Sequence, residues 1–146
     1  MSERWAATTP FTEALRSDPD RPRPDRPNVV VVLLDDVGFA QFGCFGSDIE
    51  TPNIDRLAAG GLSFNRFHVT SICSASRAAL MTGRNHHAVG MGSVADGATE
   101  APGYTSRIPK SAATLQRHLR DDGYSTFAVG KWHLTPNGER SHAGPY

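Results

Sequence analysis

The feature that most constrains the fold is the segment Asn-Val-Val-Val-Val-Leu-Leu at residues 28–34, in which every residue after Asn28 is apolar. Valine is β-branched and favours extended structure, and successive side chains of a strand point to opposite faces. A run that is apolar at every position is therefore typical of a strand buried on both faces, as in a parallel sheet covered by helices. The run predicts an α/β fold with a mostly parallel sheet.

Later segments alternate between helix and strand patterns. Thr51 and Pro52 are typical of the N-cap and first position of a helix, and Gly60 and Gly61 are typical residues beyond its end. Alternation of helices with strands favours a layered α/β fold. The first helix is expected within the segment 51–61, between Thr51 and Gly60. Further helices are expected at residues 76–81 and 111–123, and further strands at residues 62–69 and 124–129.

Residues 1–27 differ in amino-acid composition from the rest of the chain. They contain five of the ten prolines, and residues 18–27 alternate proline with charge. Such a segment is expected to be an extended, solvated lead-in without chemistry of its own. The remaining residues, 28–146, fit a single domain by length.

Composition excludes two classes of partner. Fifteen Lys and Arg residues balance fifteen Asp and Glu residues, whereas nucleic-acid-binding proteins usually carry a basic excess. The apolar run is far shorter than the roughly 20 residues of a membrane-spanning helix. The first residues show no apolar core of a secretory signal, and two cysteines make no disulfide framework. We expect a cytoplasmic protein that binds neither nucleic acid nor membrane.

Asp35 and Asp36 follow the apolar run directly. Ligands of open α/β sheets bind at the carboxyl ends of the strands, so the pair lies where a site is expected. Two adjacent carboxylates repel each other, and a site that keeps both ionised usually holds a cation beside them. Hard oxygen ligands favour calcium or magnesium over zinc. The alternative is a solvated turn after the strand.

Cys73 begins the segment Cys-Ser-Ala-Ser-Arg. If a helix starts near Ala75, Cys73 lies at its N-terminus, where backbone N–H groups and the helix dipole favour an anion. Arg77 follows four residues later, which is the spacing of neighbours on one helix face. The pair therefore favours a reactive thiolate or a bound anion. The alternative is a small buried residue that happens to precede an arginine.

Lys131 and His133 follow the last predicted strand, in the segment Gly-Lys-Trp-His-Leu. Alternate residues of an extended segment point the same way, so both side chains can reach one pocket while Trp132 faces the other side. Lysine can bind an anionic oxygen, and histidine can exchange a proton near neutral pH. The alternative for His133 alone is a structural or exposed histidine. The convergence of three polar clusters at predicted strand ends favours a site.

Four segments, in the same order along the chain, resemble the motifs of the sulfatase family. The family's Cys-x-Pro-Ser-Arg motif, with Thr-Gly following, resembles residues 73–83, and its Asp-Asp-x-Gly motif resembles residues 35–38. Its Thr-Pro-Asn-Ile/Leu-Asp-x-Leu-Ala segment resembles residues 51–58, and its Gly-Lys-Trp-His segment resembles residues 130–133. The resemblance runs from residue 28 to the end, and four ordered motifs together are highly specific.

The resemblance implies an alkaline-phosphatase-like α/β fold and an arylsulfatase-like sulfuric ester hydrolase that acts on a small-molecule sulfate ester. It implies that a formylglycine-generating enzyme oxidises Cys73 to Cα-formylglycine. One hydroxyl of the aldehyde hydrate would attack sulfur and release the alcohol. Asp35, Asp36 and the modified Cys73 would bind calcium, which polarises the sulfate oxygens.

The resemblance also assigns roles to the remaining candidates. Arg77 would steady the hydrate and the metal-bound oxygens. Lys131 would bridge the hydrate and a sulfate oxygen, which offsets negative charge in the transition state. His133 would accept the proton whose loss allows sulfate to leave. The predicted catalytic residues are therefore Cys73, Arg77, Lys131 and His133.

Two differences from the family pattern change these expectations. Position 75 is alanine where the family usually has proline, which removes a residue that preorganises a helix start and puts efficient conversion of Cys73 in question. Family members also continue for several hundred residues and supply more calcium ligands and groups near the leaving alcohol. We therefore expect residues 28–146 to be the N-terminal part of a truncated sulfatase domain, inactive on its own.

Two alternative functions follow from the same residues. A phosphonate or phosphodiester hydrolase of the same superfamily would share the formylglycine motif and the metal site. A non-catalytic remnant would keep the motifs only by descent, and its incomplete sheet would expose an edge and an apolar face. Substrate specificity in similar enzymes comes largely from loops further along the sequence, so residues 1–146 do not identify which sulfate ester is the substrate.

Overall fold

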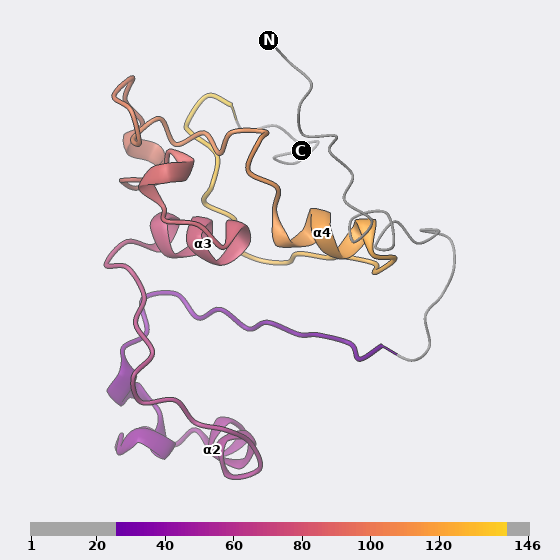
Figure 1. The fold of residues 1–146 in the computed structure, drawn as a ribbon. Coiled ribbons are helices and arrows are strands. Elements are labelled where there is room, and N and C mark those ends of the chain that lie inside the picture. Colours follow the sequence, from indigo (N-terminus) through magenta and orange to yellow (C-terminus); the bar gives the residue numbers. More distant parts are fainter. Residues whose placement is uncertain (1–25, 140–146) are drawn as a thin grey trace. The chain divides into compact units, whose positions relative to one another are not determined.

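The computed structural model describes residues 26–139, and their chain path is shown in Figure 1. These residues divide into two compact units: residues 26–29 with 71–139, and residues 30–70. The predicted lead-in of residues 1–27 lies almost wholly outside the described residues.

The described residues form three α-helices and four short 3-10 helices. The α-helices are α2 (Pro52–Ala59), α3 (Cys73–Thr82) and α4 (Leu115–Asp121). The 3-10 helices are η1 (Phe39–Gln41), η2 (Gly43–Phe45), η3 (His87–Val89) and η4 (Ala95–Gly97). No helix within residues 26–139 is both long and apolar enough to cross a membrane.

The predicted strands are not formed between residues 26 and 139, where no segment is assigned as a strand. Residues 28–34 are drawn as a ribbon without helical turns, indigo to purple in Figure 1. Strand formation requires a neighbouring strand to accept and donate backbone hydrogen bonds, and this part of the chain supplies none. The apolar side chains of residues 29–34 are 39–84% exposed. The prediction that this run is buried on both faces is therefore corrected.

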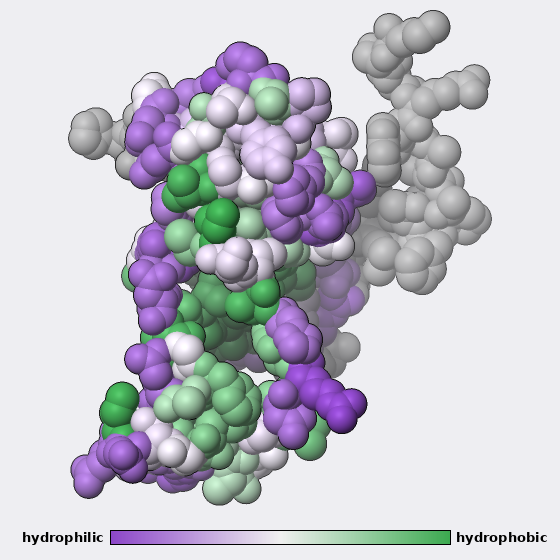
Figure 2. Space-filling model, turned by 90° about the vertical axis from the view of Figure 1, so that its left-hand side faces the viewer, coloured by the Kyte–Doolittle hydropathy of each residue, from purple (hydrophilic) through white to green (hydrophobic). Residues whose placement is uncertain are grey.

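The same exposure recurs in the other segments that were predicted to be strands. Phe67 is 76% exposed and Phe127 is 88% exposed, so neither segment buries its apolar side chains. Figure 2 shows apolar side chains on the surface of the molecule. Residues 62–69 and 124–129 thus keep the composition of strands without the pairing.

Helix α3 confirms the helix predicted around residues 76–81 and begins three residues earlier, at Cys73. Its N-cap is Ile72, whose carbonyl accepts a hydrogen bond from the Ser76 N–H at 3.0 Å. Gly83 ends the helix as predicted, because its φ of 64° lies in the left-handed region that glycine adopts without strain. The earlier start places Cys73 in the first turn.

Helix α4 confirms the predicted helix but begins at Leu115 instead of Ser111. The hydroxyl of Thr114 accepts a hydrogen bond from the Arg117 N–H at 3.3 Å and caps the helix. The preceding residues form a turn in which Ala112 donates to the carbonyl of Pro109 at 2.8 Å. Threonine thus acts as the N-cap in place of the serine three residues earlier.

Asp55 organises the second unit around helix α2. Its Oδ1 accepts hydrogen bonds from the Cys44 N–H at 2.8 Å and the Thr51 hydroxyl at 2.9 Å. The Thr51 oxygen accepts a further bond from the Gly43 N–H at 2.8 Å. A Cβ on Gly43 would lie 2.6 Å from Asp55 Oδ2, so a larger residue there would require the Asp55 carboxylate to shift. Thr51 precedes the helix as predicted, but its hydroxyl binds η2 and Asp55 and makes no cap bond.

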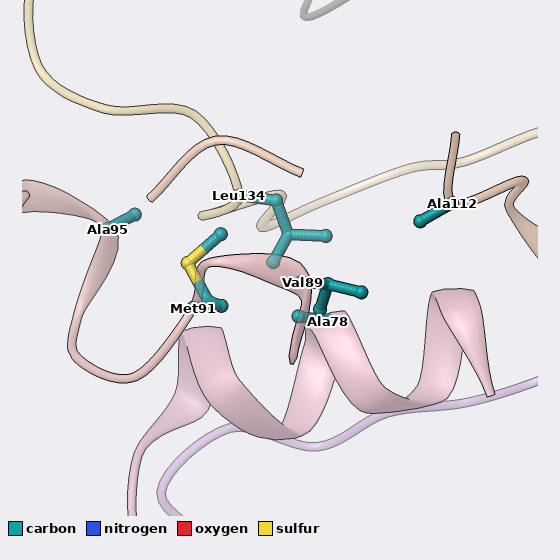
Figure 3. Close-up of a cluster of buried hydrophobic side chains, with 6 residues drawn as sticks. All are labelled: Ala78, Val89, Met91, Ala95, Ala112 and Leu134. Carbon is teal, nitrogen blue, oxygen red and sulfur yellow. The ribbon is translucent and has the colours of Figure 1, made fainter. Parts of the chain in front are cut away.

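The first unit contains a small apolar core beside α3 (Figure 3). Ala78 of α3 packs there with Leu134, and the side chain of Ala95 is fully buried. Leu134 directly follows His133, and Ala95 directly precedes Asp96. Packing therefore fixes the backbone next to two polar side chains. The cluster consists of Ala78, Val89, Met91, Ala95, Ala112 and Leu134.

Candidate active site

Cys73 is the first residue of α3 and is half-buried. The first turn of a helix carries backbone N–H groups without partners inside the helix, and the helix dipole adds partial positive charge at that end. Negative charge on the Cys73 side chain, or on a ligand beside it, is stabilised by this placement. The predicted position of Cys73 at a helix N-terminus is confirmed.

His133 lies against Cys73. Its Nδ1 is 3.3 Å from the Sγ of Cys73, although sixty residues separate the two in sequence. His133 has a φ of 56°, in the left-handed region, which costs a non-glycine residue about 1 kcal/mol or more. The buried Leu134 anchors the following residue in the core, so packing holds this backbone conformation.

Arg77 ties the segment that carries His133 to α3. Its side chain is buried, and its Nη1 donates a hydrogen bond to the carbonyl oxygen of Lys131 at 2.6 Å. This contact joins the segment of Cys73 and Arg77 to the segment of Lys131 and His133, two of the three polar clusters that were predicted to converge. The residue Lys131 is exposed, and Trp132 packs against the apolar core. The roles predicted for the Arg77 and Lys131 side chains toward a substrate stay predictions.

Asp96 is a polar neighbour of His133 that the sequence did not indicate. Its Oδ2 lies 3.7 Å from the Nε2 of His133. The side chain of Asp96 is 43% exposed and that of His133 is 15% exposed. His133 thus lies between a cysteine at one ring nitrogen and a carboxylate at the other.

Ser74 explains how Asp96 reaches this position. Ser74 is completely buried, and its hydroxyl accepts a hydrogen bond from the Ala95 N–H at 3.0 Å. The bond joins the residue after Cys73 to the residue before Asp96. Asp96 lies in the short 3-10 helix η4, and its sequence context, Val-Ala-Asp-Gly, contains no recognisable motif.

Asp35 and Asp36 belong to the second unit and are exposed. Asp36 has a φ of 53°, in the left-handed region. Only three non-glycine residues of the described chain have a positive φ, and two of them, Asp36 and His133, are predicted site residues. Aspartate tolerates this region in turns, so the Asp36 conformation fits both a functional site and the solvated turn given as its alternative, and the metal role of Asp35 and Asp36 stays a prediction. Within residues 26–139, however, no three His, Cys, Asp or Glu side chains gather closely enough to hold a metal ion.

These contacts define a site in which a cysteine at a helix N-terminus is paired with a histidine. Such a site supports nucleophilic or proton-transfer chemistry on an anionic group. The family model of the sulfatases matches residues 27–144. The chain therefore belongs to the sulfatase family, as its motifs predicted.

Individual relatives agree with the family model. Human steryl-sulfatase is 43% identical over 112 residues, which cover 75% of this chain and 19% of that protein. Human arylsulfatase A is 39% identical over 122 residues, covering 82% of this chain and 23% of the relative. The arylsulfatase of Klebsiella aerogenes is 33% identical over 112 residues, covering 75% and 24%. The chain thus spans roughly a fifth to a quarter of the length of these relatives.

Proposed function

We propose that this chain is part of a sulfuric ester hydrolase that acts on small-molecule sulfate esters. The observation that carries the proposal is the 3.3 Å contact between Cys73 Sγ and His133 Nδ1 at the N-terminus of α3. The sulfatase family match and the arylsulfatase and steryl-sulfatase relatives support it. Family membership supports the reaction class, and the contact supports the choice of Cys73 and His133 as site residues.

We further propose that Cys73 is converted to Cα-formylglycine by a formylglycine-generating enzyme. The modified residue supplies a hydrated aldehyde, whose hydroxyl is the nucleophile. The oxygens of the hydrate are bonded to the same Cβ atom that carries Sγ in cysteine. One of them can therefore occupy a position close to that of Sγ, beside His133. The chain meets one requirement for this chemistry, because an oxygen at that place faces a proton acceptor.

His133 is proposed to be the proton acceptor at this site. Its Nδ1 faces the side chain of residue 73, and taking a proton there assists the step in which sulfate leaves. Arg77 holds the carbonyl of Lys131 and keeps the segment with His133 beside α3. Backbone N–H groups of the first turn of α3 stabilise negative charge that develops next to residue 73.

The α/β fold of the family is part of the proposal. The exposed apolar run at residues 28–34 and the segment at residues 124–129 have the composition of buried strands. We propose that they pair in a mostly parallel sheet within a complete sulfatase domain, of which residues 28–146 form the N-terminal part. Burial of their apolar side chains, which are exposed in this chain, would then stabilise the complete domain through the hydrophobic effect.

Asp35 and Asp36 are proposed as calcium ligands. Their carboxylate oxygens fit calcium in donor chemistry, and when bound the ion would polarise the sulfate oxygens. Two carboxylates are only part of the coordination, because calcium takes about six to eight oxygen ligands. The described residues bring no third acidic, histidine or cysteine side chain into a common cluster with them.

Residues 1–146 alone should therefore bind calcium weakly or not at all. Isothermal titration calorimetry on the purified chain measures calcium binding directly. Asp35→Ala is the test variant, and Asp48→Ala, which removes another exposed carboxylate, is its control. Both variants should resemble the parent chain. Tight, stoichiometric binding that is lost in Asp35→Ala and kept in Asp48→Ala would show that these residues complete the metal site by themselves.

Coexpression with a formylglycine-generating enzyme tests the proposed function. The tryptic peptide that contains Cys73 should lose about 18 Da relative to the thiol, since a carbonyl oxygen replaces sulfur and two hydrogens. The full-length protein, with any residues that continue beyond position 146, should then hydrolyse an aryl sulfate faster than an aryl phosphonate. An unmodified thiol in every copy would remove the proposed nucleophile, and a preference for the phosphonate would assign the site to phosphonate hydrolysis.

A further inference from the structure

We infer that Asp96 is a positioning residue for His133. The inference rests on the proposed function and adds a residue that none of the four sulfatase-like motifs contains. Its basis is the order of contacts: Asp96 Oδ2 lies 3.7 Å from His133 Nε2, and His133 Nδ1 lies 3.3 Å from Cys73 Sγ. The two ring nitrogens therefore face two different partners.

The Asp96 carboxylate determines which ring nitrogen carries the proton. A neutral imidazole has one N–H and one lone pair, and a carboxylate attracts the N–H. Asp96 therefore favours the tautomer with hydrogen on Nε2, which leaves the Nδ1 lone pair directed at residue 73. That tautomer is the one that can accept a proton from a group on residue 73.

The separation of 3.7 Å is longer than a hydrogen bond, so Asp96 acts through its charge at close range. Charge is effective here because the His133 side chain is only 15% exposed. The Asp96 side chain is 43% exposed, and this partial solvation limits the effect. We therefore expect an effect smaller than that of removing His133 itself.

The surrounding structure is built to hold Asp96 in place. Ala95 is buried in the core, and its N–H donates to the buried hydroxyl of Ser74. The N–H of Gly97 donates to the carbonyl of Val94 at 2.9 Å and closes the turn. Ser74 is adjacent to Cys73, so the same helix end that presents residue 73 also positions Asp96.

The position of His133 is fixed independently. Leu134 lies in the core, and Arg77 binds the carbonyl of Lys131. The backbone on both sides of His133 is therefore held, while the rotation and the tautomer of its ring are left to the groups on either side. Asp96 lies beside its Nε2 and residue 73 beside its Nδ1.

The test uses the full-length, formylglycine-containing protein and the charge-removing variant Asp96→Asn. In a reaction where the alcohol leaves before the sulfate, kcat/KM reports the steps up to alcohol release, and kcat also includes sulfate release. Asp96→Asn should lower kcat about tenfold and change kcat/KM much less, as expected for an outer partner of a functional histidine. Asp96→Glu should restore most of kcat, because it returns the charge.

Two controls separate a positioning role from a structural one. Glu100→Gln removes the same charge from a side chain that is 95% exposed, and it should leave both constants unchanged. In a His133→Ala background, Asp96→Asn should have no additional effect, because its action passes through the histidine. Equal losses in kcat and kcat/KM, a loss shared by Asp96→Glu, or additive losses in the double variant would overturn the inference.

A second readout does not depend on activity. Nitrogen-15 NMR of the histidine rings in the unmodified protein, at a pH where the ring is neutral, distinguishes the two tautomers of His133. The signal should report hydrogen on Nε2 in the parent protein and in Glu100→Gln, and a shift toward the Nδ1 tautomer in Asp96→Asn. If the parent protein does not hydrolyse sulfate esters, the proposed function fails while this measurement still decides the inference. An unchanged tautomer in Asp96→Asn would overturn it.

Discussion

Replacing Cys73 with alanine in the full-length protein should abolish sulfate ester hydrolysis. Alanine has no group that can become an aldehyde, so the proposed nucleophile is lost. Removing the nucleophile of an enzyme costs about 10⁴-fold or more in kcat, because the remaining groups act as a unit with it. Steady-state hydrolysis of an aryl sulfate, measured beside the parent protein, gives the ratio.

The chain offers a matched control for this experiment. Cys44 is the other cysteine, and its side chain is exposed. Cys44→Ala keeps the backbone N–H that donates to Asp55, so the second unit stays intact. Its activity should equal that of the parent protein. Normal hydrolysis in Cys73→Ala, or an equal loss in both cysteine variants, would contradict the assignment of Cys73.

Replacing His133 with alanine should produce the second largest effect, and one of a different kind. We expect kcat to fall by about 10²- to 10⁴-fold, which is the usual contribution of a positioned acid or base. The ratio kcat/KM should fall less, because His133 is proposed to act mainly after the alcohol has left. Rapid-mixing experiments should accordingly show a burst of alcohol followed by slow turnover.

His118→Ala is the control for a general effect of removing a histidine. His118 lies on α4 and is exposed, and alanine is a good helix former, so activity should be retained. Parallel losses in kcat and kcat/KM for His133→Ala, without a burst, would show that the histidine acts in substrate binding or alcohol release instead.

The helices were predictable because their signals are local. Pro52 at the first position of α2 and Gly83 after α3 specify helix ends through their own backbone preferences. The exact limits differed by a few residues, and at the starts of α4 and α3 the capping positions were taken by Thr114 and Ile72. These preferences depend only on residues that are close in sequence, so they can be predicted without knowing what the helix packs against.

Strand formation and the polar neighbours of the site depend on residues far away in the sequence. The run at residues 28–34 has strand composition, but a ladder needs a partner that residues 26–139 do not provide. Proximity of Cys73 and His133 could be expected from the rule that sites gather at strand ends. Asp96 could not, because the Ser74–Ala95 hydrogen bond and core packing bring it there, and neither leaves a pattern in the sequence.

The exposed apolar run has a consequence for the behaviour of the chain in solution. Six apolar residues without charge, all at least 39% exposed, form the kind of segment that stacks into cross-β aggregates. Pro27 precedes the run and Asp35 and Asp36 follow it, so a residue that cannot extend a ladder and two negative charges flank it. In stacked copies the aspartates would lie over one another and repel. The carboxylates proposed to hold calcium should therefore also oppose stacking of this segment, and neutralising them should favour association of the chain with itself.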